Sequence, residues 1–131
     1  MSGWSEKILD IDLNTQTYKT YPLDMEMARL FIGGRGLGAR LLWDMVGPEV
    51  DPLSSENVLI FTNGPLTGTG YQTSNRFSVT TKSPLTGTVL DANSGGFWGM
   101  QFKNPHLSVG FIVLCVLIAL NLFGLFLGHV F

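Results

Sequence analysis

Short stretches of alternating apolar and polar positions, separated by turn-forming residues, make up much of the first hundred residues. Residues 7–13, KILDIDL, alternate in this way and predict a half-buried strand. The polar run at 14–16 predicts a turn, and residues 17–21 supply a second strand. Together these segments predict a β-hairpin that ends at Pro22.

Helical spacing begins after this hairpin. Asp24 is a predicted N-cap for a helix over 25–31, and a second helix is expected over roughly 38–46, before the Gly-Pro pair at 47–48. The glycine-rich run at 33–38 lies between the two helices. Because this run follows a helix and not a strand, it matches a dinucleotide-binding loop only weakly. We interpret it as a turn from one helix to the next.

Turn-rich sequence then alternates with short strands. β-Branched and aromatic residues predict the strands, and glycine, proline and asparagine predict the turns between them. The expected strands are 58–62, 76–82 and 88–91, the expected turns are 63–70, 83–87 and 92–96, and a short helix is expected over 97–102. The described order is thus one of short strands and short helices, followed by one hydrophobic C-terminal helix.

The C-terminal segment, residues 104–131, differs from everything before it. The 8 basic and 10 acidic residues of the chain all lie at or before Lys103. Residues 107–127 are apolar on every face, and about 20 such residues span the hydrocarbon core of a bilayer. We therefore divide the chain into a domain over 1–103 and a hydrophobic tail over 104–131, with a predicted transmembrane helix at 107–127. A buried core helix is the alternative for the tail.

The distribution of charge and hydropathy also predicts a localisation. No apolar run follows the first residues, so we expect no cleavable signal peptide. Positive charges precede the tail and none follows it, so the positive-inside tendency places the N-terminal part in the cytoplasm. The expectation is a cytoplasmic domain, held at a membrane if the tail inserts.

The composition of the chain argues against several kinds of functional site. The formal net charge of −2 argues against a nucleic-acid-binding domain, which would show a basic face. Cys115 alone can form no internal disulfide and cannot hold a zinc ion or an iron–sulfur cluster, each of which normally needs about four ligands. His106 and His129 lie in or beside the tail, so no Ser-His-Asp set can form before it. We predict no catalytic residue and no metal ligand.

Backbone groups and one arginine remain as candidate chemistry. The Asn-Ser-Gly-Gly run at 93–96 precedes a predicted helix, and glycines let main-chain N–H groups approach a ligand closely. Arg76 opens a neighbouring predicted strand, and a guanidinium can fork onto a phosphate. These residues predict a site for a phosphate-bearing group. The alternative is ordinary: glycine turns between strands, with Arg76 on the surface.

Several blocks in order make residues 1–103 resemble a known family. The blocks are LNT at 13–15, GGRGL at 33–37, DPLS at 51–54, GPLTGT at 64–69, Arg76, TKSPLTG at 81–87 and ANSGG at 92–96. Together they resemble the N-terminal domain of the tungsten-containing aldehyde ferredoxin oxidoreductases.

The resemblance implies a fold and a function. The fold is of the α+β class, an incomplete mixed β-sheet domain with short helices, before the hydrophobic C-terminal helix. Members of this family oxidise aldehydes to carboxylic acids and pass electrons through a 4Fe-4S cluster to ferredoxin, with tungsten held by the dithiolenes of two pterins of the molybdopterin type. Dithiolene sulfurs hold tungsten or molybdenum, so the choice of metal stays open, as does the aldehyde. In the family pattern three residues fall at pterin-contacting positions and three are adjacent to them: Arg76, Asn93 and Gly95, with Ala92, Ser94 and Gly96.

The sequence departs from the family after residues 101–103. The family continues there with a Gly-Tyr-Asp segment, whereas this chain turns to Asn-Pro-His at 104–106 and the tail. On this resemblance the cluster ligands and the later domains are absent from the chain. Three interpretations follow: an oxidoreductase fragment whose remaining domains are a separate partner chain, a membrane-anchored cofactor-binding or assembly module, or an inactive truncated product.

Overall fold

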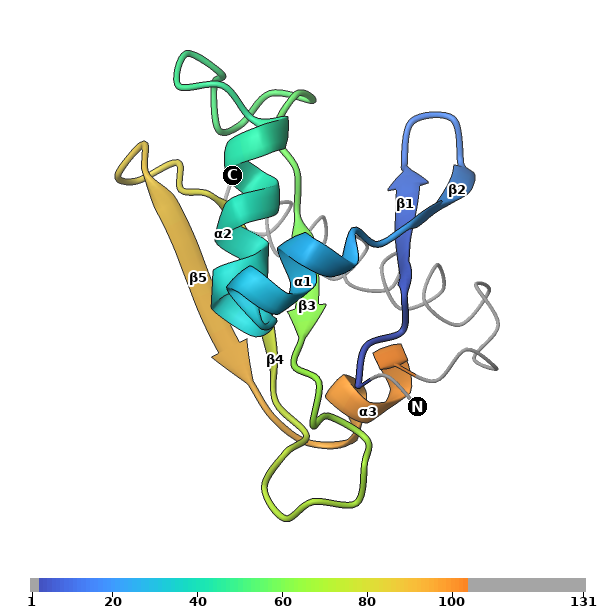
Figure 1. Ribbon diagram of the computed structural model, residues 1–131. Coiled ribbons are helices and arrows are strands. Elements are labelled where there is room, and N and C mark those ends of the chain that lie inside the picture. The colour runs from blue at the N-terminus through green and yellow to red at the C-terminus, as the bar shows by residue number, and fades with distance from the viewer. Residues whose placement is uncertain (1–2, 104–131) are drawn as a thin grey trace, which may run out of the picture.

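Five strands and three helices follow one another in the computed structural model, which describes residues 3–103 (Figure 1). In chain order they are β1 (Lys7–Asp12), β2 (Thr17–Pro22), α1 (Met25–Phe31), α2 (Gly34–Met45), β3 (Ile60–Asn63), β4 (Phe77–Lys82), β5 (Val89–Ser94) and α3 (Phe97–Lys103). Over residues 3–103, no helix is long and apolar enough to cross a membrane. The transmembrane helix predicted at 107–127 lies outside the described residues.

The α+β class is confirmed. β1 and β2 form one sheet, and β3, β4 and β5 form a second sheet in that order. The sequence predicted a mixed sheet, but every strand pairing within 3–103 is antiparallel. Short turns connect β1 to β2 and β4 to β5, and such connections join antiparallel neighbours, whereas parallel strands need a long crossover.

The first hairpin forms as predicted, with small shifts at its ends. Lys7 pairs with Pro22 and Asp12 pairs with Thr17. Pro22 is therefore the last residue of β2 and not the first residue after it; a terminal strand position tolerates the missing N–H. At the turn, Asp12 Oδ1 accepts the N–H groups of Asn14 at 2.9 Å and Thr15 at 3.3 Å, which is an Asx-turn.

The predicted cap of α1 is confirmed, whereas the predicted start of α2 is wrong. Asp24 caps α1, because its side chain accepts the N–H of Glu26 at 2.9 Å. α2 begins at Gly34 and not near Gly38, so most of the glycine-rich run is helical and only Gly33 remains in the turn. Glycine is a poor helix former in isolation. Tertiary contact overrides that preference here.

That contact is a close approach of α2 to the sheet. A Cβ added at Gly38 would overlap Thr80 Oγ1 and lie 3.3 Å from Thr62 Oγ1. One turn earlier, a Cβ at Gly34 would lie 3.6 Å from Ser78 Oγ, and the Gly34 carbonyl accepts the Thr62 hydroxyl at 2.8 Å. Figure 1 shows α2 lying along one face of the β3–β4–β5 sheet.

The buried residues at this interface are mostly small and polar. Among the described residues the buried apolar side chains are Ala28, Leu37 and Leu42. Thr62, Ser78 and Thr80 are also buried, and each donates or accepts a hydrogen bond. Many large apolar side chains lie exposed instead, so the apolar core formed within residues 3–103 is small.

The opposite face of the sheet is covered in part by α3. Phe102 lies with its ring centroid 5.5 Å from Phe61, 5.7 Å from Phe77 and 5.6 Å from Trp98. Lys103, the last residue of α3, donates from Nζ to the Pro65 carbonyl. Partial burial lowers the pKa of the Lys103 ammonium.

A buried lysine ties the sheet to the loop after α2. Lys82, at the end of β4, is only 9% exposed, and its Nζ donates to the carbonyls of Pro48 at 2.6 Å and Val50 at 2.7 Å. A third carbonyl, that of Gly47, lies 3.4 Å away. These bonds satisfy a charge that would otherwise be costly to bury, and they fix the loop against the sheet.

We predict that Gly38→Ala lowers the free energy of unfolding. The overlap with Thr80 forces the helix away from the sheet, and the greater helix propensity of alanine offsets only part of that cost, so the expected net loss is about 1–2 kcal/mol. Urea denaturation of the full chain measures it. Gly47→Ala is the control, because a Cβ there meets only an ordinary contact with Val50. Equal stability of the two variants would contradict the close packing.

We predict that Asp12 makes the hairpin sensitive to acid. Hydrogen bonds from Thr15, and then from the Asn14 N–H, hold the pKa of Asp12 below its ordinary value of 3.8. A lowered pKa in the folded state means that the stabilisation is present above about pH 4 and is lost as pH falls through the folded pKa. Acid titrations of stability should therefore differ between the native chain and Asp12→Asn. Asp10→Asn, on the same strand, is the control and should follow the native chain.

Candidate functional site

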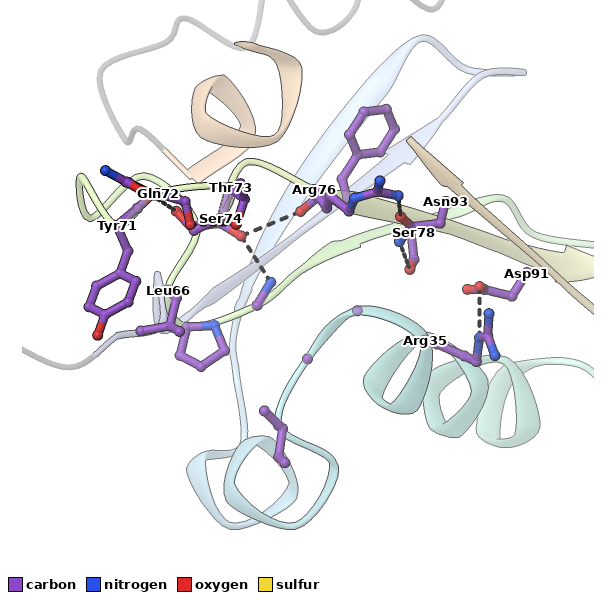
Figure 2. Close-up of a pocket in the computed structure, with 17 residues that line it drawn as sticks. Arg35, Leu66, Tyr71, Gln72, Thr73, Ser74, Arg76, Ser78, Asp91 and Asn93 are labelled. Carbon is purple, nitrogen blue, oxygen red and sulfur yellow. Dashed lines mark hydrogen bonds and ion pairs between the residues drawn. The ribbon is translucent and has the colours of Figure 1, made fainter. Parts of the chain in front are cut away.

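An open groove of about 840 Å³ lies where the start of α2 faces the sheet and the loop after β3 (Figure 2). Its volume falls in the range of small-molecule sites, roughly 300–1,000 Å³. The turn between α1 and α2 and the loop over 64–74 form two walls, and β4 and β5 supply the floor. The lining residues are Ile32, Gly33, Gly34, Arg35, Gly64, Pro65, Leu66, Thr67, Tyr71, Gln72, Thr73, Ser74, Arg76, Phe77, Ser78, Asp91 and Asn93.

Arg76 immediately precedes the first residue of β4, and Asn93 of β5 holds its side chain in the groove. Its Nη1 donates to Asn93 Oδ1 at 2.8 Å, and Asn93 Nδ2 donates to Ser78 Oγ at 3.2 Å. Ser78 is opposite Asn93 in the β4–β5 register, so both side chains lie on the same face of the sheet. Ser78 is buried, which fixes the far end of this chain of hydrogen bonds.

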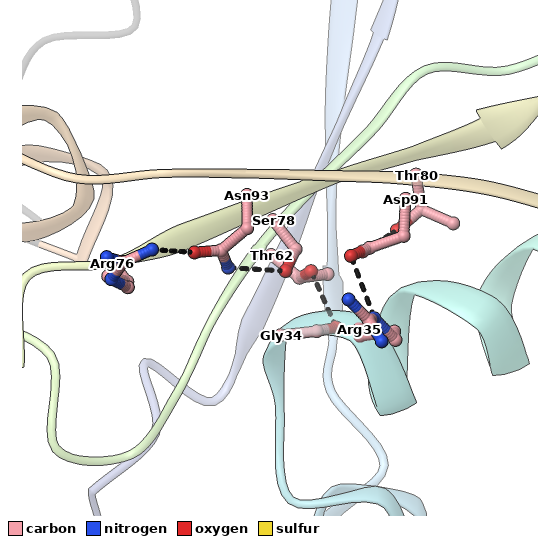
Figure 3. Close-up of polar contacts among 8 residues, drawn as sticks. All are labelled: Gly34, Arg35, Thr62, Arg76, Ser78, Thr80, Asp91 and Asn93. Atoms are coloured by element: carbon pink, nitrogen blue, oxygen red, sulfur yellow. Dashed lines mark hydrogen bonds and ion pairs between the residues drawn. The ribbon is translucent and has the colours of Figure 1, made fainter.

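A second arginine reaches the groove from α2. Arg35 donates from Nε to Asp91 Oδ2 at 2.9 Å, and Asp91 Oδ1 accepts the Thr80 hydroxyl at 3.3 Å (Figure 3). The Asp91 side chain is 8% exposed and that of Arg35 is 76% exposed. The carboxylate is therefore part of the floor, and the guanidinium lies in the open groove.

The loop wall is tied to Arg76 through its backbone. Thr67 is buried, and its hydroxyl lies 3.4 Å from the Arg76 carbonyl and 3.3 Å from the Gly64 N–H. On the other wall, a Cβ at Gly33 would come within 2.5 Å of the Asn63 carbonyl, so only glycine fits there. The turn between the helices and the loop after β3 thus pack directly against each other at the edge of the groove.

The structure brings two of the six predicted site residues together in the groove, namely Arg76 and Asn93. Asn93 was predicted in a turn, but β5 runs to Ser94, because the pairing of β5 with β4 continues to Phe77. Alternation along β5 places Ala92 and Ser94 on the face of the sheet away from α2.

Gly95 and Gly96 follow β5, in the connection to α3, and are absent from the groove lining. Gly96 has φ +90°, a value that favours glycine, and no heavy atom lies within 4 Å of a Cβ built at Gly95 or Gly96. The space beside both residues is open. α3 has seven residues, so the helix start expected to attract a phosphate is short.

The sequence analysis identified only Arg76 and Asn93 among the lining residues, and it missed the polar residues that bond beside them, Arg35, Ser78 and Asp91. Arg35 was interpreted as part of a turn, and Asp91 pairs with it across 56 positions of the chain. The register of β4 with β5 puts Ser78 and Thr80 on one face of the sheet. No local signal showed that this face meets a helix.

Chemically, the groove offers anion-binding groups and no metal-ligand set. Two guanidiniums face one carboxylate in it. Within residues 3–103, no three side chains of the histidine, cysteine, aspartate or glutamate type gather where they could hold a metal ion.

Comparison with known proteins points to one family. Residues 8–114 match the family model described as the N-terminal domain of aldehyde ferredoxin oxidoreductase. The tungsten-containing aldehyde ferredoxin oxidoreductases of Pyrococcus horikoshii and Pyrococcus abyssi are 46% and 47% identical over 103 residues, which cover 79% of this chain and 17% of each relative. The aliphatic sulfonate oxidoreductase, WOR-like subunit, of Pyrococcus furiosus is 38% identical over 106 residues.

A solved structure has the same fold. It is the active-site complex BamBC of benzoyl coenzyme A reductase with 1,5-dienoyl-CoA, at a TM-score of 0.75 and 38% identity. The similarity covers 78% of this chain and 16% of that one. This chain therefore spans about a sixth of the length of the relatives it matches.

We predict that Ser78→Ala destabilises the floor of the groove. The variant removes the acceptor of Asn93 Nδ2, and loss of one such hydrogen bond costs about 1 kcal/mol. Urea denaturation of the full chain measures the change. Ser55→Ala, at an exposed position away from the groove, is the control and should leave stability unchanged. A Ser78→Ala chain as stable as the control would show that the hydroxyl does not hold Asn93.

Proposed function

The chain belongs to the aldehyde ferredoxin oxidoreductase family, as its N-terminal domain, and on that premise we propose that it supplies part of the binding site for a tungsten–pterin cofactor. One observation carries the proposal. Arg76 lies in a groove with its guanidinium held by Asn93 at 2.8 Å, and the family resemblance implies that this arginine contacts a pterin.

The residues present suit a phosphate-bearing cofactor. Asn93 occupies only Nη1 of Arg76, and within the described part of the chain Nε and Nη2 donate to no protein acceptor. A guanidinium with free donors binds phosphate oxygens through short, charge-assisted hydrogen bonds. Asn93 thus orients the guanidinium, and the groove has room for the rest of the ligand.

Gly95, with Gly96 adjacent to it, is the third proposed cofactor contact. The space beside their Cα atoms is open, so a ligand can approach the backbone there more closely than any side chain would allow. Ala92 and Ser94 flank Asn93 on the other face of β5, and we assign them to the strand that carries Asn93 and not to the groove. The cofactor contacts proposed are therefore Arg76 and Asn93, with Gly95 beside them.

The activity of the whole family member goes beyond this chain. When bound, a tungsten–pterin group supplies the redox chemistry by which an aldehyde becomes a carboxylic acid. The residues described here bind and orient; we propose no proton transfer or substrate contact for them. The use of ferredoxin as acceptor is likewise a proposal, and it follows from the names of the relatives.

The exposed apolar surface supports a protein partner. Phe61, Leu90 and Val89 are 40%, 38% and 51% exposed on β3 and β5, and Trp43 on α2 is 79% exposed. Phe61 and Leu90 lie on the same face of the sheet, away from α2, and exposed apolar side chains gathered on one face are typical of an interaction surface. We propose that the remaining domains of an oxidoreductase of this family cover it.

We predict that Arg76→Ala loses the cofactor. The full chain and the variant are purified from cells supplied with tungstate, and the tungsten and pterin that accompany each are quantified by mass spectrometry and by pterin fluorescence. The native chain should retain both, and the variant should lose most of both, because the phosphate loses its charged donor.

Arg40→Ala is the matched control for this experiment. Like Arg76, Arg40 is held by another side chain, that of Asp44, but it lies on α2 and is not part of the groove lining. It should retain as much pterin as the native chain. Equal pterin in the Arg76→Ala and native chains, or none in the native chain, would contradict the proposed role.

A further inference from the structure

Helix α3 packs against the backbone that carries Arg76, immediately before β4. Gly99, in the middle of α3, is buried, and a Cβ built there would lie 2.7 Å from the Asn75 carbonyl oxygen and 3.3 Å from the Arg76 carbonyl carbon. Both atoms belong to the main chain, so they cannot turn aside as the end of a flexible side chain would. Only glycine therefore fits between α3 and the backbone of these two residues.

The helix is itself held on the sheet. The Phe102 ring lies with its centroid 5.5 Å from that of Phe61 and 5.7 Å from that of Phe77. Asn63, at the end of β3, donates from Nδ2 to the Gly99 carbonyl at 3.1 Å. Glycine inside a helix costs about 1 kcal/mol relative to alanine. The close approach to the backbone before β4 gives a physical reason for a glycine at this position.

The same helix also holds the beginning of the connection from β3 to β4, residues 64–76. Lys103 donates from Nζ to the Pro65 carbonyl and, at 3.4 Å, to the Gly64 carbonyl. The Gly64 N–H lies 3.3 Å from the Thr67 hydroxyl, which lies 3.4 Å from the Arg76 carbonyl. Figure 1 shows α3 beside this connection. Contacts from α3 therefore lead to the backbone of Arg76 from both ends of the connection.

The position of the Arg76 guanidinium depends on this backbone. The guanidinium is held by a single hydrogen bond of 2.8 Å to Asn93. An ordinary contact begins at 3.4 Å, so relief of the overlap that a Cβ at Gly99 would create needs a shift of about 0.7 Å. A shift of that size at the guanidinium is enough to take the bond to Asn93 to the limit of hydrogen-bonding distance. Close packing at Gly99 is thus linked to the orientation of Arg76.

We propose that Gly99 is a positioning residue of the phosphate contact: it lets α3 lie against Asn75 and Arg76, and so keeps the Arg76 guanidinium where Asn93 orients it. The inference rests on the proposed function, which assigns Arg76 to the phosphate of the ligand. It extends the site beyond the groove, because α3 supplies no residue to the groove lining and yet sets the position of the arginine.

The first test needs no ligand. The chain has four arginines, so isotope-labelled arginine gives few side-chain signals in a nuclear magnetic resonance spectrum of the full chain, and Arg76→Lys assigns that of Arg76. Asn93→Ala breaks the bond to Nη1 and gives the signal of a guanidinium that is no longer held. Gly99→Ala should move the Arg76 signal toward that position. An Arg76 signal that stays at its native position would overturn the proposal.

Two variants control this experiment. Gln101→Ala changes a residue of α3 that lies two positions further along the helix, hence on a different face, and it should leave the Arg76 signal unchanged. Asn63→Ala removes one hydrogen bond to the Gly99 carbonyl and decides the matter if Gly99→Ala does not fold. It should move the Arg76 signal in the same direction by a smaller amount, and a native signal in it would then refute the role of α3.

The second test is the Kd of a pterin phosphate monoester, measured with the full chain by calorimetry at constant ionic strength. Gly99→Ala should raise the Kd about tenfold, as expected for the loss of one charged hydrogen-bonded contact. Reduced stability alone would not do this, because a chain that is nine-tenths folded binds only about a tenth more weakly. Urea denaturation gives the folded fraction. Gln101→Ala should bind with the native Kd.

A double variant separates positioning from general damage to the groove. If Gly99 acts through Arg76, then Arg76→Ala/Gly99→Ala should bind no more weakly than Arg76→Ala alone. A further tenfold loss in the double variant would contradict that route. Weak binding in Arg76→Ala with native affinity in Gly99→Ala would refute this inference and leave the proposed function standing. Native affinity in Arg76→Ala would refute the proposed function and, with it, this inference.

Discussion

The close approach of α2 to the β3–β4–β5 sheet is the constraint on which the rest of the described structure depends. Gly38 lets the helix lie against Thr80 at a distance that no side chain at that position would allow, and Gly34, one turn earlier, lies beside Ser78. A hydroxyl bonds across the interface, from Thr62 to the Gly34 carbonyl. Because hydrogen bonds are directional, this bond helps to fix the start of the helix on the sheet. Leu37 and Leu42 of α2 are among the few apolar side chains that are buried within residues 3–103.

The groove follows from where this contact places the start of α2. Gly33 packs against the backbone of Asn63 and Gly64, so the turn before the helix and the loop after β3 lie side by side. Arg35 then extends over β5 and reaches Asp91. A helix one side chain further from the sheet would lift Arg35 away from that carboxylate, which would leave a buried charge unpaired. The close packing of α2 on the sheet is therefore also what keeps Arg35 within reach of Asp91.

Local patterns predicted the elements well where local chemistry decides them. The first hairpin and α1 were found from alternation and from the Asp24 cap, because those signals act over a few residues. The glycine-rich run was misread, because its helical state depends on a sheet that follows about 30 positions later in the chain. For the same reason the first hairpin was predictable, but the antiparallel pairing of β3, β4 and β5 was not. The resemblance drew attention to Arg76 and Asn93, and the structure adds that they bond to each other; nothing local indicated Arg35 or Asp91.

The groove also links binding to stability. Arg35 is carried by α2, Arg76 lies at the start of β4, and both are anchored on β5, so the polar contacts of the groove connect a helix to two strands. A ligand that binds only this arrangement stabilises it by mass action. The domain has few buried apolar contacts of its own within residues 3–103, so such a connection would be a substantial part of its stability. Ser78 and Thr80 then serve two purposes with the same atoms: they form the close contact with the glycines of α2, and they hold the side chains of Asn93 and Asp91 that anchor the arginines. A substitution that loosens the helix is thus expected to weaken anion binding as well.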